Sequence, residues 1–197
     1  MTTIVYKNSY SAPPIDRREA LRYAGVRGES AEAEKMLDEC IGDSRDILSY
    51  RLCFARYPLT RVKNSLDFGF SAVESEKLFS HLSDCTEVIV FAATIGAKFD
   101  RLAAKYAKIS PAKALILQGL GAERIESLAD LFSRELIEGG LDITSRFSAG
   151  YSDLSLEFQK DIFRALDCQK NIGLTLNESL IMSPTKSITA IIGIKDK

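Results

Sequence analysis

The segment Val88–Gly96 reads VIVFAATIG, and the prediction of the fold starts from it. It opens with the longest uninterrupted apolar run of the chain, Val88–Ala93, which is typical of a strand covered on both faces. The following Thr94–Gly96 predicts a tight turn, and apolar residues at helical spacing after it predict a helix. Because a membrane span needs about 20 apolar residues, this run indicates a buried strand of a globular protein.

On either side of this segment the sequence predicts further strands and helices, bounded by capping and turn residues. Extended segments are expected at residues 1–9, 50–57, 62–68, 88–92, 143–149, 174–178 and 188–194. Helices are expected at 16–24, where Asp16 and Glu19 are spaced as a helix start, and from Ser30 until Gly42 and Asp43 break the helix. Further helices are expected after a Ser71–Glu74 capping box, after Gly96, from Pro111 to Gly139 with an interruption near Gly119 and Gly121, and after a Ser155 cap.

Two pairings are expected between these elements. Strands 50–57 and 62–68 are close enough in sequence to form an antiparallel hairpin. Asp130 and Arg134 are spaced to form an ion pair on the outer face of the long helix.

The order of the elements predicts an α+β fold, because strands come in apparent hairpins and helices come in runs. We expect a twisted, mostly antiparallel sheet with helices packed around it. A length of 197 residues favours a single domain over residues 1–197, with residues 1–11 as an N-terminal extended segment. A chain of this size buries enough surface to fold without disulfide or metal.

The composition argues against several functional classes. The chain has 26 Lys and Arg against 27 Asp and Glu, for a net charge of −1, whereas a nucleic-acid binder would show a basic excess. No basic segment followed by an apolar one stands at the N-terminus, so we expect a cytoplasmic protein with no membrane partner. The dispersed cysteines predict buried, reduced thiols; they are Cys40, Cys53, Cys85 and Cys168.

Motifs for hydrolysis, zinc binding and dinucleotide binding are incomplete. Any Ser–His–Asp triad would have to use His81, and both candidate nucleophile segments, 69–73 and 150–154, lack the final glycine of the hydrolase elbow. One histidine with scattered cysteines does not supply a zinc site. Gly96 alone does not make Gly-x-Gly-x-x-Gly. We therefore expect no catalytic residue and no metal ligand.

The segment Arg146–Tyr151, RFSAGY, is the most suggestive for binding. Arg146 offers a planar charged fork suited to a carboxylate, and Gly150 allows close approach of the backbone to a ligand. Tyr151 adds an aromatic wall and a hydroxyl. Together they can hold an amino-acid-like group beside a flat ring. From these residues alone, a structural alternative is favoured: an arginine bonded to loop carbonyls, a turn glycine and a packed tyrosine.

A second polar segment, Leu176–Ser187, lies between two predicted strands. A plain connection would explain it, but it is denser in hydrogen-bonding groups than a surface hairpin needs. Its possible site-lining residues are Glu178, Ser179, Met182 and Pro184.

The two segments, in this order, resemble the activation module of cobalamin-dependent methionine synthase. The Arg-x-x-x-Gly-Tyr motif of that family is matched by Arg146, Gly150 and Tyr151. The resemblance covers roughly residues 12–194. The other similar segments are Phe91–Gly96, Arg124–Asp130, Ile172–Ser179 and Met182–Pro184.

The resemblance implies a C-shaped α+β fold with a twisted antiparallel sheet, and S-adenosylmethionine as the ligand. Arg146 would hold the methionyl carboxylate. The backbone at Ser148 and the pair Gly150 and Tyr151 would line the ligand, and Glu126 would contribute a polar contact from the long helix.

The resemblance also implies the function. In the family, cobalamin that has oxidised to the cob(II) state is methylated again, with S-adenosylmethionine as methyl donor and flavodoxin or a similar protein as electron donor. A sulfonium is already activated, so the protein supplies binding and orientation and needs no general base. The cobalamin signature Asp-x-His-x-x-Gly is absent, so we expect action in trans on cobalamin-carrying methionine synthase modules, with cobalamin held only by that partner.

Two alternatives stay open. The chain can be a docking or scaffold module that has lost the ligand, since Gly140 stands where the long form of the family has an acidic ligand contact. It can also keep the ligand and serve another corrinoid methyltransferase.

Overall fold

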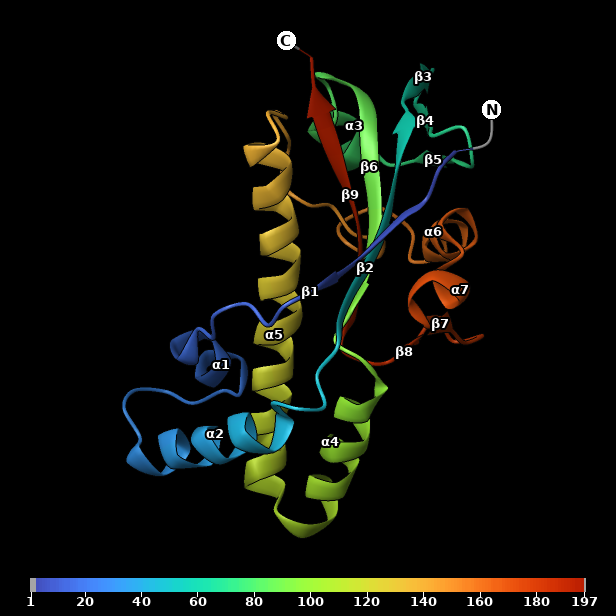
Figure 1. Cartoon of the computed structure of the whole chain (residues 1–197). Helices are drawn as coiled ribbons and strands as arrows, with labels where there is room; N and C mark the ends of the chain where they lie inside the picture. Colours follow the sequence, from blue (N-terminus) through green and yellow to red (C-terminus); the bar gives the residue numbers. More distant parts are fainter. Residues whose placement is uncertain (1–2, 197) are drawn as a thin grey trace.

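A four-stranded antiparallel sheet forms the centre of the computed structural model, which describes residues 3–196. Its strand order is β1-β2-β6-β9, with β1 at Tyr6–Tyr10, β2 at Tyr50–Pro58, β6 at Cys85–Thr94 and β9 at Ser187–Lys195 (Figure 1). The apolar run at residues 88–93 lies in β6, between β2 and β9. Its side chains are buried on both faces, so the expectation for this run is confirmed.

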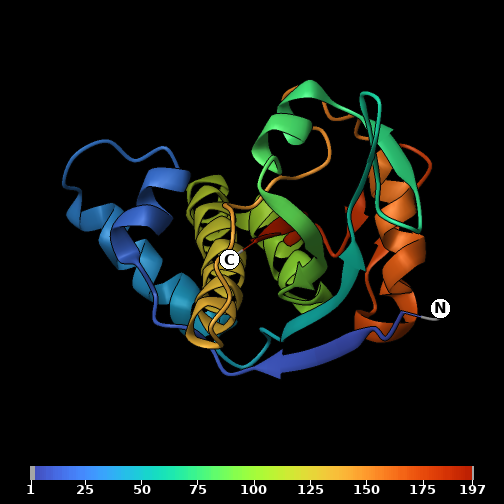
Figure 2. The same ribbon diagram turned by 90° about the horizontal axis from the view of Figure 1, so that it is seen from above.

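The described chain has seven helices, which pack on this sheet or on one another. They are α1 (Arg17–Tyr23), α2 (Ala31–Ser44), α3 (Glu76–His81), α4 (Ala97–Ile109), α5 (Pro111–Glu138), α6 (Phe158–Leu166) and α7 (Cys168–Ile172). Residues of α1, α2, α4 and α5 share one core with the sheet, and residues of α3, α6 and α7 share the other. Figure 2 shows α1 and α2 at one end, α6 at the other, and the strands between them. The predicted α+β fold with an antiparallel sheet is confirmed.

The long helix α5 runs without a break for 28 residues, so the predicted interruption near Gly119 and Gly121 is wrong. Both glycines are places of close approach. A Cβ on Gly119 would lie 2.6 Å from the backbone nitrogen of Ala24, and one on Gly121 would lie 2.6 Å from the Phe99 ring. The glycines therefore let α1 and α4 pack closely on α5.

This packing predicts opposite effects for alanine at two helical glycines. Gly119→Ala should lower the free energy of unfolding by about 2 kcal/mol, because the added methyl meets rigid backbone of α1. Gly42→Ala should raise it by about 0.5–1 kcal/mol, because Gly42 lies in α2 with no atom within 4 Å of the new methyl and alanine is the better helix former. Urea unfolding of both variants gives the comparison. A stabilised Gly119→Ala variant would contradict the close approach.

Several expected boundaries differ from the structure. The segment expected as a capping box forms strand β5 (Ala72–Glu74), and the cap of α3 is Ser75, whose Oγ accepts a hydrogen bond from the Leu78 N–H. Helix α2 passes through Gly42 and ends at Ser44. The helix expected after Ser155 begins at Phe158, without a side-chain cap.

The expected hairpin is also different. The segment 62–68 contains the end of β3 (Thr60–Val62) and all of β4 (Ser65–Asp67), which pair with each other, and β4 pairs with β5. Strand β2 pairs with β1 and β6 instead. The segment 174–178 contributes only β7 (Thr175–Leu176), which pairs with β8 (Met182–Ser183).

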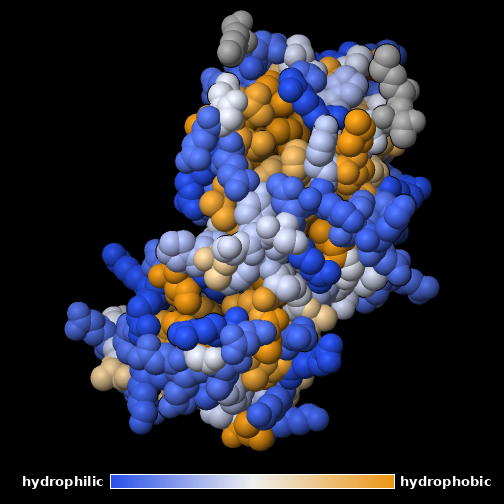
Figure 3. Space-filling model, viewed as in Figure 1, coloured by the Kyte–Doolittle hydropathy of each residue, from blue (hydrophilic) through white to orange (hydrophobic). Residues whose placement is uncertain are grey.

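The surface in the view of Figure 3 is mostly hydrophilic, with hydrophobic residues gathered in separate areas toward its upper and lower ends. Among residues 3–196, no helix combines the length and the apolar character that a membrane span requires.

Candidate functional site

The loop that follows α5 is fixed against the edge strand β9. The N–H of Phe147 donates to the Ile191 carbonyl at 2.9 Å, and the N–H of Ile191 donates to the Phe147 carbonyl at 2.8 Å. The Phe147 side chain is buried in the core that α3, α6 and α7 share with the sheet. Arg146 is directed the other way, toward α5.

Arg146 forms two ion pairs with carboxylates that lie one turn apart on α5. Its guanidinium donates to Asp130 Oδ1 at 2.6 Å and to Glu126 Oε2 at 2.9 Å. Its side chain is 23% exposed, whereas those of Glu126 and Asp130 are 39% and 54% exposed. The structure thus brings together Arg146 and Glu126, two of the residues expected at the site. Asp130 is paired with Arg146 and not, as expected, with Arg134.

The turn after Arg146 needs its glycine. Gly150 has φ +84°, and its N–H donates to the Leu154 carbonyl at 2.9 Å. A Cβ there would lie 3.0 Å from the Leu156 side chain, so a larger residue would be both strained and crowded. The Ser148 carbonyl accepts from the Tyr151 N–H at 3.1 Å, which closes the turn. Tyr151 remains 65% exposed and presents its ring to solvent beside Phe147.

Helix α3 holds the other side of this loop. Asp153 accepts hydrogen bonds from the Ser75 hydroxyl at 2.6 Å and from the Glu76 N–H at 2.7 Å. The hydrogen bond from Ser75 lowers the pKa of the Asp153 carboxyl. His81 lies with its Nε2 atom 2.8 Å from the Ser145 carbonyl, so the histidine has a structural contact. The loop is therefore anchored by α3 and by β9.

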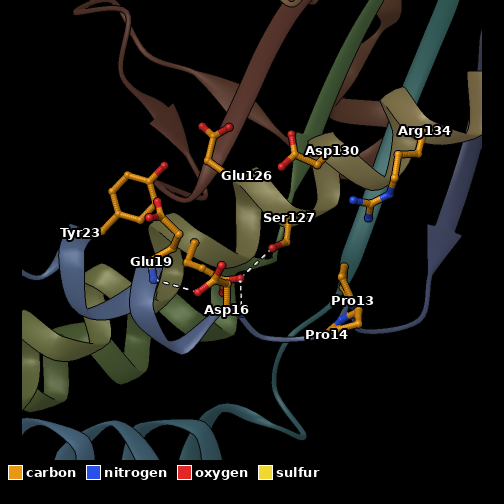
Figure 4. Close-up of a pocket in the computed structure, with 10 residues that line it drawn as sticks. Pro13, Pro14, Asp16, Glu19, Tyr23, Glu126, Ser127, Asp130 and Arg134 are labelled. Atoms are coloured by element: carbon orange, nitrogen blue, oxygen red, sulfur yellow. Dashed lines mark hydrogen bonds between the residues drawn. The ribbon is translucent and has the colours of Figure 1, made fainter. Parts of the chain in front are cut away.

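A groove of about 310 Å³ lies between α1 and α5 and reaches the carboxylates that hold Arg146. Figure 4 shows Glu126 and Asp130 projecting from α5, with Glu19 and Tyr23 coming from α1. The lining is rich in carboxylates, and Arg134 is its cation. The lining residues are Pro13, Pro14, Asp16, Glu19, Tyr23, Glu123, Glu126, Ser127, Asp130 and Arg134.

A buried ion pair fixes the wall of this groove. Arg124 and Glu123 are neighbours on α5 with side chains 1% and 2% exposed, and they form two N–H···O contacts of 2.5 Å. Arg124 also donates to the carbonyls of Pro13 at 2.6 Å and Pro14 at 2.7 Å. Glu123 accepts from the Asp16 N–H at 3.0 Å. This network attaches the segment that precedes α1 to the side of α5.

The second polar segment lies apart from this loop along β9. Phe147 faces Ile191 in the middle of β9, whereas the β7–β8 hairpin leads into the start of β9 at Ser187. Met182 packs on the core of α3, α6 and α7, on the face of the sheet opposite to Arg146. Among residues 3–196, no hydrogen bond or ion pair joins the two segments.

The remaining residues expected to line the site lie within the β7–β8 hairpin or directly after it. Glu178 borders a different cavity beside α6 and α7, and Ser179 lies in the turn before β8. The Pro184 carbonyl accepts a hydrogen bond from the Ser187 hydroxyl at 2.7 Å. Their role in binding stays a prediction.

Several groove residues were not expected from the sequence. The sequence predicted Asp16 only as a helix cap. The structure confirms this cap, because the Asp16 side chain accepts a hydrogen bond from the Glu19 N–H at 3.0 Å. Glu19 was expected only at the start of this helix and Arg134 only as a partner of Asp130, and Tyr23 carries no motif. The Pro13-Pro14 pair just before a capping aspartate was the available signal that this segment has a fixed path. Among residues 3–196 no group of His, Cys, Asp and Glu is arranged to hold a metal ion.

Comparison with known proteins gives a structural likeness. No protein-family model matches the sequence, and a comparison with curated proteins found no match. A solved structure of the MetH reactivation domain bound to AdoHcy matches with a TM-score of 0.73 and 16% identity, over 97% of this chain and 78% of that chain. At this identity the likeness establishes the fold, which is the one expected from the motif at Arg146.

Proposed function

We propose that this chain is an S-adenosylmethionine-binding module that supports reductive methylation of cob(II)alamin on a separate cobalamin-dependent methionine synthase. The observation that carries the proposal is the position of Arg146. The loop with the Arg-x-x-x-Gly-Tyr motif meets α5 at Glu126 and Asp130, which line the groove between α1 and α5. The solved structure with the same fold carries AdoHcy, the product that S-adenosylmethionine leaves after methyl transfer.

The charge of the groove suits this ligand. S-adenosylmethionine has two cationic groups, the sulfonium and the ammonium, and one carboxylate. The carboxylates of Asp16, Glu19 and Asp130 face the cationic groups in this assignment, and the carboxylate of the ligand goes to Arg146. An exposed ion pair contributes only about 0–1 kcal/mol, so a ligand carboxylate can replace one that Arg146 makes with α5.

The chemistry asks only for binding and orientation from this chain. The sulfonium supplies an activated methyl group, and one electron from a flavodoxin-like donor reduces the cobalt that the partner carries. Arg146 and the groove carboxylates hold the ligand at the surface in this proposal, and the exposed Tyr151 follows five residues later on the same loop. Positioning of this kind contributes several kcal/mol to a group transfer, about 7–11 in the best cases. Methionine synthase modules in trans are the proposed partner.

A reactivation assay tests the proposal. A cobalamin-dependent methionine synthase without its own activation domain is held as cob(II)alamin and supplied with a reductant. Adding this chain together with S-adenosylmethionine should restore the absorbance spectrum of methylcobalamin, and leaving out either one should not. Restoration at the same rate without this chain would contradict the proposal. The same assay with another corrinoid methyltransferase tests whether that protein is the partner of this chain instead.

One observation favours a ligand-free docking module as the second candidate. Arg146 is already neutralised by two carboxylates of α5. For a docking module, capture of the corrinoid protein by this chain should be the same with and without S-adenosylmethionine. For the proposed module, the ligand should strengthen the capture.

A further inference from the structure

Arg51 is a partly buried cation for which residues 3–196 supply no partner. It lies on β2 opposite Thr94 of β6. Its Nε atom is shielded from solvent and has no hydrogen-bond acceptor, and no ion pair or hydrogen bond of its guanidinium occurs among residues 3–196. Its terminal nitrogens lie against Gly173, since a Cβ there would be 3.4 Å from one of them. Because a shielded N–H group without an acceptor is costly, the Nε atom of Arg51 favours an anion close to this guanidinium.

Two more cations share a cavity with Arg51. The cavity has a volume of about 450 Å³ and is lined by Arg51 from β2 and by Lys98 and Arg101 from α4. Neither Lys98 nor Arg101 forms an ion pair within the part of the chain that the structure describes. Asp46 is the acidic residue of the lining, so the cations outnumber the acids by three to one.

The backbone at the same place adds hydrogen-bond donors. Gly96 precedes α4 with φ +92° and gives the helix no side-chain cap, so the N–H groups of the first turn have no side-chain acceptor. A Cβ on Gly96 would lie 2.5 Å from the Ser49 hydroxyl, so only glycine leaves this path of the backbone open. Uncapped N–H groups at the start of a helix, next to cations, match the requirements of an oxyanion.

We propose that this cavity binds a phosphate group, as the free anion or as part of a small phosphorylated metabolite. Arg51 lines the cavity from β2, and its guanidinium donates hydrogen bonds to the anion in this proposal. Lys98 and Arg101 close on the anion from the solvent side. The site lies between β2 and the start of α4, whereas the groove lies between α1 and α5, so this proposal does not depend on S-adenosylmethionine binding.

Nitrogen-15 NMR of the whole chain tests the site, with inorganic phosphate titrated against chloride at constant ionic strength. Phosphate should shift the amide signals of residues 96–98 saturably, and chloride should not. Arg51→Gln should weaken phosphate binding about 10-fold or more, because a charge-assisted hydrogen bond is lost. Ribose 5-phosphate gives the second arm: tighter binding than phosphate identifies a phosphorylated metabolite, and equal or weaker binding identifies the free anion.

Two further variants complete this experiment, one as a control and one as a second test. Arg56→Gln removes the same charge from the same strand, but Arg56 is paired with Glu87, so phosphate binding should change by less than about twofold. Arg101→Gln, on the exposed surface of α4, should weaken binding about threefold or more even where Arg51→Gln perturbs folding. Absence of a saturable shift at residues 96–98, or equal affinity in Arg51→Gln, Arg101→Gln and Arg56→Gln, would overturn the proposal.

Discussion

Arg146→Ala is expected to weaken binding of S-adenosylmethionine about 30- to 100-fold. The guanidinium is the group proposed to hold the ligand carboxylate. A hydrogen-bonded charge pair that the bound ligand shields from water contributes about 2–3 kcal/mol, more than the exposed ion pair that it replaces. The loop itself should persist, because it is fixed by Phe147 on β9 and by Asp153 on α3. Isothermal titration calorimetry of the variant and the parent chain gives the ratio of dissociation constants.

The matched control is Arg56→Ala. Arg56 is also paired with a carboxylate, Glu87, but lies on β2 outside the groove. Its loss should change the affinity by less than about twofold, as an exposed ion pair contributes little. Equal affinities of the Arg146→Ala and Arg56→Ala variants would remove Arg146 from the binding site. A gain in affinity would mean that Arg146 serves mainly to neutralise Glu126 and Asp130.

Arg124→Met should lower the free energy of unfolding by about 3–5 kcal/mol. The substitution leaves the Glu123 carboxylate buried without its counter-ion and leaves the carbonyls of Pro13 and Pro14 without donors. The segment before α1 should then loosen from α5, because the network is what attaches it. Unfolding in guanidinium chloride, followed by circular dichroism, measures the change in the free energy of unfolding.

A surface arginine provides the comparison for this loss. Arg17 pairs with Glu34 and Asp38 but is 42% exposed, so Arg17→Met should cost no more than about 1 kcal/mol. Replacing Glu123 and Arg124 together by apolar residues should recover part of the stability lost in Arg124→Met, since no charge is then left unpaired. A cost below 1 kcal/mol for Arg124→Met would show that the buried pair does not hold the segment.

Local patterns predicted most of the elements, because burial and spacing follow the chain. The apolar run in β6, the caps at Asp16 and Ser30, and the stop at Gly139 all act within a few residues. The errors arose where distant segments decide the outcome. Gly119 is a breaker by propensity, yet it lies in a continuous helix because α1 needs the space that a side chain would occupy.

The candidate site divides in the same way. The motif identified Arg146, but its ion-pair partner Asp130 was assigned to Arg134, since helix spacing makes that pair possible and the distant loop that competes for it leaves no local signal. The groove residues of α1 meet those of α5 only in the folded chain. The sequence therefore predicted Asp16 and Glu19 only as residues at a helix start. Their place in the groove became visible only in the structure.

A crystal structure of the chain grown with millimolar S-adenosylmethionine tests the central claim most directly. The account predicts the ligand in the groove between α1 and α5, with its carboxylate on the guanidinium of Arg146 and at least one of the ion pairs to Glu126 and Asp130 broken. An empty groove at that concentration, with Arg146 still paired to both carboxylates, would contradict it.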